Sequence, residues 1–400
     1  MAEAESPIKR VQAATDPYAW VILAVVMLAG VSAPLNQFKV PPVMPVLMER
    51  FQLDLSAAGM LMSIFAITGL ALALPAGFIL QRLGARASGL IALGCLAAGA
   101  AGGALSQSAD LLLASRLLEG VGMGLIAVVA PAVVVTWFPP ERRGLPMGIW
   151  ATWVSLGSLI IYDAAPALNS LSGWQAVWWA GALFALAAFV LYGLLVRPAP
   201  GAAPRAERAS ALPWRALANR NIWLLAVSFA SFNFVVIGVV ATYFPTFLKT
   251  VRGMSLAEAS LVTSLKMITV ILAAPLAGWL SDRIGSPRKI ILISLLGLAV
   301  FMCFPFTVTG IGIPASMVAL GILAGSLPTA TFAAAPAVMG DSRLGGLGMG
   351  VIMVGQNLGQ LAGPVVFGAL VKSAGWAEAG LWSILALAIG FAALWFAKMR

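Results

Sequence analysis

Twelve long apolar stretches constrain this chain more than any other feature of its sequence. A helix that crosses a bilayer needs about 20 mostly apolar residues, and short polar or Gly/Pro segments separate stretches of that kind along the chain. The stretches cover residues 18–48, 56–80, 88–107, 111–138, 145–168, 174–196, 221–249, 256–280, 288–309, 313–338, 346–371 and 376–397. The sequence therefore predicts an all-α membrane protein with twelve transmembrane helices.

Composition excludes the other fold classes. Hydrophobic residues make up 61% of the chain and charged residues 10%, against about 45–50% and about 25% in ordinary globular proteins. The net charge of +10 would suggest nucleic-acid binding in a soluble protein, but in a membrane protein it reports topology. The chain has two cysteines and no histidine, so we expect no metal site, no cofactor and no nucleic-acid partner.

The basic residues predict the orientation. Most of the 24 lysine and arginine residues fall in segments that lie on one side of the membrane if both termini are cytoplasmic, as an even number of spans requires. Such a bias in short loops marks the cytoplasmic side. We expect a multi-pass protein of the plasma (bacterial inner) membrane, with residues 1–16 as a cytoplasmic tail rather than a signal peptide.

The chain repeats itself after about half its length. Residues 77–84 align with 278–285, 144–148 with 346–350, and 130–133 with 335–338. Each pair falls at the same span of its half, which is the pattern of two parallel bundles related by an axis along the membrane normal. We predict an N-terminal six-helix bundle over 17–196, a cytoplasmic linker over 197–220 and a C-terminal six-helix bundle over 221–400.

The loop after the second span of each half carries a motif of the form G-x-x-x-D-R-x-G-x-[RK]. The second half supplies Gly278, Asp282, Arg283, Gly285 and Arg288. The first half supplies Gly77, Arg82, Gly84 and Arg86, with Gln81 in place of the aspartate. Its charges either latch the cytoplasmic side shut in one conformation or only set topology, and we interpret these residues as a cytoplasmic gate.

With this motif and the run Arg116-Leu-Leu-Glu-Gly120, the chain resembles the major facilitator superfamily. The resemblance implies two pseudo-symmetric six-helix bundles with a substrate path between them, served by alternating access. The run at 355–364 loosely resembles that of the monocarboxylate, oxalate–formate and cyanate-type anion carriers.

Two lysines fall at matching depth in opposite halves. Lys39 and Lys266 each lie about 14–15 Å from the outer end of their span at 1.5 Å per residue, near the midplane, where a charge is costly. If both face inward they bind an anion between them, with Asn36 on the face of Lys39. Alternatively they extend toward the interface or pair with Glu119 and Asp163.

Arg116 and Glu119 stand three residues apart on one helical face. They form either a proton-linked switch or a permanent structural pair, and Asp163 is a second candidate for the proton site.

Uncharged polar and aromatic groups complete the expected cavity. Gln356, Asn357 and Gln360 lie in a glycine-rich stretch of span eleven and either bind substrate oxygens or hydrogen-bond between helices. Trp150 on span five and Tyr243 on span seven are further candidates for substrate contact.

The predicted function is secondary transport of a small, carboxylate-type anion by proton symport or anion exchange. The alternative is a proton-coupled multidrug efflux antiporter that uses Glu119 or Asp163. We do not expect an enzyme, because the sequence lacks a nucleophile–base set and a phosphate loop. The expected partners are the anion, protons and membrane lipid, and the expected state is a monomer.

Overall fold

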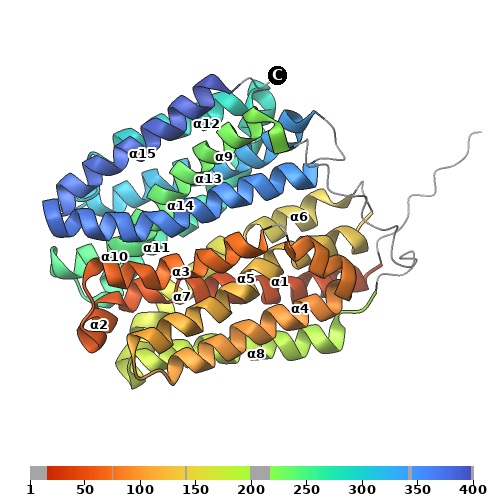
Figure 1. Cartoon of the computed structure of the whole chain (residues 1–400), viewed down its shortest axis with the longest axis horizontal. Coiled ribbons are helices and arrows are strands. Elements are labelled where there is room, and N and C mark those ends of the chain that lie inside the picture. The colour runs from red at the N-terminus through yellow and green to blue at the C-terminus, as the bar shows by residue number, and fades with distance from the viewer. Residues whose placement is uncertain (1–15, 74, 140–141, 199–216, 341–344, 398–400) are drawn as a thin grey trace, which may run out of the picture.

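The computed structural model describes the chain except residues 1–15, 74, 140–141, 199–216, 341–344 and 398–400. The described part is helical almost throughout (Figure 1). The helices of the first half, called the N half below, are α1 (Tyr18–Gln37), α2 (Val40–Phe51), α3 (Leu55–Leu72), α4 (Pro75–Ala104), α5 (Ala109–Trp137), α6 (Gly144–Ala151), α7 (Trp153–Ser172) and α8 (Trp174–Leu195).

The second half, called the C half, begins after the predicted linker. Its helices are α9 (Arg220–Asn233), the π-helical segment η3 (Phe234–Ala241), α10 (Thr242–Thr250), α11 (Leu256–Ile284), α12 (Pro287–Phe301), α13 (Gly312–Met339), α14 (Gly345–Ala374) and α15 (Trp376–Phe396). The predicted tail and most of the linker lie outside the described residues, so the boundaries of the two bundles remain predictions.

Eleven helices or continuous runs of two or three helical segments in the described residues are long and apolar enough to cross a membrane. The ninth predicted span, 288–309, is helical only over α12, which has 15 residues. Pro305 explains the early end, because its missing N–H cannot bond to Phe301 and its ring disfavours helix at the residue before it. The sequence pattern overestimated this helix.

Each loop motif contains a sharp turn between two helical stretches. In the first half the turn lies at Gly84, where φ is 79° and the segment labelled α4 kinks between two helices. Helix α11 likewise runs to Ile284 and is followed by Gly285 with φ of 63°. These left-handed conformations favour glycine, which explains the glycine at this position in both motifs.

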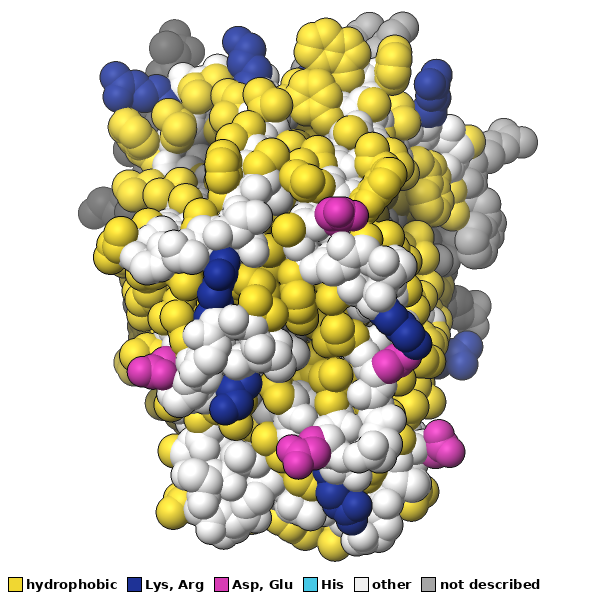
Figure 2. Space-filling model, turned by 90° about the vertical axis from the view of Figure 1, so that its left-hand side faces the viewer, with side chains coloured by type: hydrophobic (Ala, Val, Ile, Leu, Met, Phe, Trp, Pro, Cys, Tyr) yellow, Lys and Arg dark blue, Asp and Glu magenta, His cyan; other side chains and the backbone are white. Residues whose placement is uncertain are grey.

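Helices α2 of the N half and α10 of the C half contact each other at one end of the bundle (Figure 1). We call it the α2–α10 end, and the opposite end, which carries the two motifs, the loop-motif end. Helices α3 and α14 pack along each other across the halves, as do α7 and α11. Figure 2 views the α2–α10 end and shows apolar side chains at its middle with charged side chains scattered around them.

Candidate functional site

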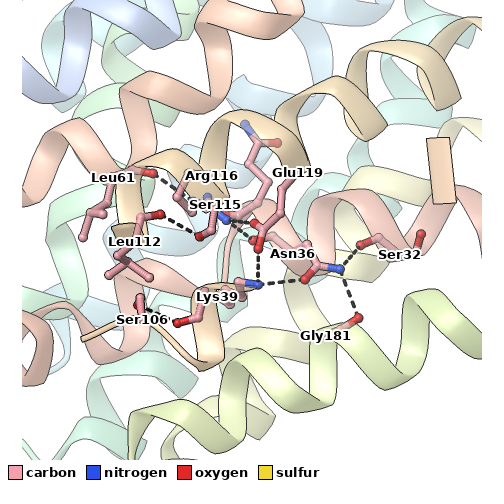
Figure 3. A network of polar contacts seen from close by, with 12 residues as sticks. Ser32, Asn36, Lys39, Leu61, Ser106, Leu112, Ser115, Arg116, Glu119 and Gly181 are labelled. Atoms are coloured by element: carbon pink, nitrogen blue, oxygen red, sulfur yellow. Dashed lines mark hydrogen bonds and ion pairs between the residues drawn. The ribbon is translucent and has the colours of Figure 1, made fainter. Parts of the chain in front are cut away.

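A cluster of three charged side chains lies inside the N half (Figure 3). Lys39, Arg116 and Glu119 are all 0% exposed. One carboxylate oxygen of Glu119 accepts from the Lys39 ammonium at 2.7 Å, and the other accepts from the Arg116 guanidinium. Two cations therefore share one anion. Both carboxylate oxygens of Glu119 accept a hydrogen bond, but the three side chains together keep one positive charge.

Helix breaks explain why Arg116 binds here. Pro41 has no N–H to donate to the carbonyl of Gln37, four residues earlier. Arg116 supplies the missing donors: its guanidinium donates to the carbonyl of Gln37 at 2.8 Å and to that of Asn36 at 2.6 Å. The same side chain donates to the carbonyl of Leu61 on α3 at 3.0 Å. Arg116 thus ties the broken end of α1 to α3 and α5.

Lys39 points into the N half rather than toward the second lysine. Its ammonium donates to the Asn36 side-chain oxygen at 2.9 Å and stands 4.8 Å from the ring centroid of Trp178. Asn36 in turn donates to the carbonyl of Gly181 on α8 at 3.3 Å. This conformation therefore has the alternative arrangement, in which Lys39 pairs with Glu119.

Among the buried cations of the described residues, Lys266 is the one without an ion pair. It is 4% exposed on α11 and makes no hydrogen bond or ion pair with any residue that the structure describes. The neighbouring hydroxyls of Thr263 and Thr269 donate to carbonyls of their own helix. Because α11 contacts α7 of the other half, Lys266 places an uncompensated charge on a helix at the boundary between the halves.

A chain of amides crosses between the halves near the middle of the spans. Gln37 of α1 donates to the side-chain oxygen of Gln360 on α14 at 3.1 Å, and Gln360 donates to that of Asn233 at 3.1 Å. The half-buried Asn357 donates to the carbonyl of Met353, and its side chain leaves no room for a Cβ on Gly69 of α3. Gln356 is half-buried on the same helix.

Tyrosines join the halves toward the α2–α10 end. Tyr243 is 0% exposed, and its hydroxyl lies 2.7 Å from the carbonyl of Leu55 in the N half and 2.6 Å from that of Pro364 in the C half. Tyr162 of the N half donates to the carbonyl of Ala241. Tyr243 therefore belongs to a closed contact between the halves in this conformation, where a substrate has no access to it.

Two acidic residues take part in the same contact. Asp163 is exposed and accepts from the Ser264 hydroxyl of α11 at 2.9 Å. Asp54, at the start of α3, caps that helix through the N–H of Ala57 and pairs with Lys372 at 3.0 Å. The Ala57 N–H and then the Lys372 ammonium lower the pKa of the Asp54 carboxyl below its ordinary value.

Trp150 packs inside the N half. It is 6% exposed, stacks on Trp153 with ring centroids 4.9 Å apart, and fills the space over Gly30 of α1. Its expected role as a cavity wall remains a prediction.

The last arginine of each loop motif binds within its own half. Arg86 donates to the carbonyl of Gly193, and Arg288 donates to that of Trp395, each at 2.5 Å. Both carbonyls lie in the last turn of a helix, where carbonyls lack a helical partner. Arg283 stands 5.3 Å from the ring of Trp279, and the side chain of Asp282 lies outside the described residues. The predicted latch between the halves remains a prediction.

The sequence interpretation missed several residues that contact these groups. Gln37, Asn233, Tyr162 and Trp178 were not singled out, although each except Trp178 is a polar group within an apolar run. Asn233 had a signal in the sequence, since it is an amide inside the apolar stretch 221–249, as Asn36 is in the first span. Trp178 had none, because tryptophan near a span end is typical of an interface anchor.

The chain is similar to known transport proteins over most of its length. The profile of the Major Facilitator Superfamily matches residues 26–262 and 237–400. A "Probable sulfoacetate transporter" of Cupriavidus necator is 25% identical over 88% of this chain and 87% of its own. A "Hexuronate transporter" of Bacillus subtilis is 23% identical over 88% of each chain. A "Probable nitrate/nitrite transporter" of Mycobacterium tuberculosis is 33% identical over 56% of each chain.

Two solved structures show the same fold. A D-xylose–proton symporter superposes with a TM-score of 0.77 at 19% identity, covering 95% of this chain and 97% of its own. A bacterial homolog of the human lysosomal transporter Spinster superposes with a TM-score of 0.76 at 18% identity, covering 96% of this chain and 97% of its own.

Proposed function

Because this chain belongs to the major facilitator superfamily, we propose that it carries a small, carboxylate-type anion across the membrane by alternating access. It is an integral membrane protein with the superfamily fold and a secondary transporter rather than an enzyme, which agrees with the sequence prediction. The substrate class and the coupling mode, proton symport or anion exchange, are the proposed part.

Lys266 carries the proposal for an anion. An unpaired charge buried in a protein costs several kcal/mol, and a cation in mid-membrane marks a functional site by default. Lys266 is buried on a helix at the boundary between the halves and has no protein counter-ion among the described residues. A bound anion supplies that counter-ion.

The relatives support the same class of substrate. The names of the three matched proteins give sulfoacetate, hexuronate and nitrate or nitrite as their substrates, all of which are anions. For this chain we propose Lys266 as the charged contact, and the half-buried amides of Gln356, Asn357 and Gln360 as donors to the anion's remaining oxygens.

The buried cluster counts against the alternative function. Drug efflux coupled through Glu119 would require a carboxyl that exchanges its proton during transport, yet both oxygens of Glu119 are held by cations. Asp163 remains available as a coupling carboxylate, and its one hydrogen bond to a described residue comes from the Ser264 hydroxyl. We assign the cluster a structural role in the N half.

We further propose that the loop-motif end faces the cytoplasm, with both termini on that side. Most lysines and arginines outside the spans belong to segments at this end. The hydrogen-bonded contacts at the α2–α10 end then close the outer side of the path.

Uptake into proteoliposomes tests the proposal. The panel contains sulfoacetate, a hexuronate, oxalate and nitrate, each with and without a pH gradient. We expect Lys266→Gln to lower uptake of the preferred anion at least about tenfold, which corresponds to about 1.4 kcal/mol, and Lys266→Arg to retain part of it.

The matched control is Lys249→Gln, which removes an exposed lysine at the end of α10. It should transport at the wild-type rate. Undiminished anion uptake by Lys266→Gln, or uptake of lipophilic cations and no anion, would refute the proposal.

A further inference from the structure

A cavity of about 540 Å³ opens between α12, α13 and α15 at the loop-motif end of the C half. It lies away from Lys266 and from the contacts that join the halves. Its lining combines small apolar residues of α13 with a basic pair at the start of α12 and an aromatic side chain from the end of α15. The residues that matter below are Arg288, Lys289, Ala337 and Trp395.

The basic pair is not explained by helix stability. Arg288 and Lys289 occupy the first turn of α12, where the helix dipole disfavours cations and attracts anions. Ser286 precedes this turn and makes no side-chain capping hydrogen bond. The start of α12 therefore concentrates positive potential at one wall of the cavity.

Arg288 keeps donor capacity after its structural hydrogen bond. One Nη donates to the carbonyl of Trp395, but the buried Nε has no hydrogen-bond partner among the described residues. Lys289 is exposed, and none of the ion pairs found between described residues includes it. Both side chains can therefore bind an anion that enters the cavity.

Comparison of the two halves shows which residues of the cavity recur in both halves and which occur in the C half alone. Arg86 makes the same hydrogen bond to Gly193 that Arg288 makes to Trp395, at the same distance. Arg86 is followed by Ala87, however, and its acceptor is a glycine. The arginine thus belongs to the repeated fold, whereas the second cation and the tryptophan are additions of the C half.

The outer face of α12 indicates what kind of anion binds. Lys289 heads a stripe of exposed residues at helical spacing, formed by Ile293 (64% exposed), Leu296 (58%) and Val300 (56%). At 1.5 Å per residue the stripe extends about 16 Å below the lysine, a length suited to an acyl chain. Exposed Trp395 lies beside the same cavity, and aromatic residues favour the membrane–water interface.

We propose that this cavity binds the phosphate of an anionic phospholipid through Arg288 and Lys289, with an acyl chain along the apolar stripe of α12. Basic pockets between transmembrane helices near the membrane surface recognise lipid headgroups in this way. The site is independent of the proposed substrate, so its failure would leave the anion-transport proposal standing.

The test measures lipid retention by native mass spectrometry of the detergent-purified protein after titration with phosphatidylglycerol or phosphatidylcholine. We expect wild type to retain phosphatidylglycerol in preference to phosphatidylcholine. Lys289→Gln and Arg288→Gln should each lower the retained fraction at least about threefold, and Ala337→Trp should lower it by filling the cavity.

Arg86→Gln is the matched control, because it removes the equivalent carbonyl hydrogen bond in the N half and leaves the cavity intact. It should retain phosphatidylglycerol like wild type. If Arg288→Gln fails to fold, the lipid retention of Lys289→Gln alone tests the proposal. Equal retention by Lys289→Gln and wild type overturns the proposal. Binding of inorganic phosphate at this site together with equal retention of phosphatidylglycerol and phosphatidylcholine would also overturn it, since the site would then select free phosphate and not the lipid.

Discussion

Prolines leave single carbonyl groups without a helical partner, and distant side chains take their place. Pro41 has no N–H to donate to the carbonyl of Gln37, and the Arg116 guanidinium donates to that carbonyl instead. Pro245 likewise has no N–H for the carbonyl of Ala241, and the Tyr162 hydroxyl donates to it instead. A buried carbonyl without a partner is costly, and at these two breaks a polar side chain from another helix supplies the donor.

The first prediction concerns the buried charge cluster. Glu119→Gln leaves two buried cations without an anion, and removing one partner of a buried ion pair costs about 3–5 kcal/mol. We expect low yield and a clearly lower midpoint of thermal unfolding in detergent, measured by tryptophan fluorescence.

The matched variant is Lys39→Met, which leaves the Arg116–Glu119 pair with balanced charge. It should unfold closer to wild type than Glu119→Gln does. A Glu119→Gln protein as stable as wild type would show that the cluster does not depend on its carboxylate charge.

At the scale of helices, glycines set how closely α14 packs inside the C half. A Cβ on Gly355 would lie 2.2 Å from the carbonyl oxygen of Ala226, and one on Gly359 would lie 2.1 Å from that of Ala230. On Gly363 it would meet the backbone of Gly238 in η3 at 2.8 Å. The glycine-rich pattern of span eleven is therefore a packing surface for α9 and η3, and the amides lie beside it.

The second prediction tests this surface. Gly359→Ala forces the backbones of α14 and α9 apart, because the obstructing atom is a carbonyl rather than a flexible side chain. We expect a loss of about 1–3 kcal/mol in stability, the usual cost of overpacking, seen as a lower unfolding midpoint.

Gly148→Ala serves as the control, since nothing lies within 4 Å of its added methyl group. Its midpoint should stay at or slightly above the wild-type value, because alanine favours helix. Equal midpoints for the two variants would contradict the close packing of α9 on α14.

At the scale of the whole molecule, a set of polar contacts near the α2–α10 end adds to the helix packing that joins the two halves. Tyr243 is one of these contacts, and its hydroxyl lies against Gly59 of α3 and Gly368 of α14. A Cβ on Gly59 would lie 2.2 Å from this hydroxyl, and one on Gly368 would lie 2.6 Å from it. A hydrogen bond of this kind contributes about 0.5–1.5 kcal/mol net. Such an energy shifts the balance between conformations without unfolding either half.

The third prediction is that Tyr243→Phe populates a conformation open at the α2–α10 end. The reporter is Thr246→Cys in a chain with Cys95 and Cys303 replaced by alanine. Thr246 is 1% exposed, and its hydroxyl has no hydrogen-bond partner among the described residues. Tyr243→Phe should raise its rate of labelling by a membrane-impermeant maleimide by about 2–10-fold, following from the hydrogen-bond energy.

Tyr192→Phe is the control, because Tyr192 donates to Ala85 within the N half. Its labelling rate should equal that of the parent. If Tyr243→Phe labels no faster than Tyr192→Phe, the tyrosine does not hold the halves together.

The sequence by itself determined the class of protein, the internal repeat and the family. These follow from local properties. Hydropathy over about 20 residues identifies a span, and a repeated motif identifies the corresponding spans of the two halves. The helix ends were less certain from sequence, as α12 shows, because Pro305 acts on hydrogen bonds that a hydropathy pattern does not register.

Only the tertiary structure decided which partner each buried charge has. Spacing along a helix gave Lys39 and Lys266 the same depth, but depth does not specify which neighbouring helices a side chain faces. Lys39, which lies between α1 and α2, faces Glu119 and Trp178, while Lys266 has no hydrogen-bond or ion-pair partner among the described residues. The pairing depends on how the helices pack, and that information lies in contacts between segments far apart in the chain.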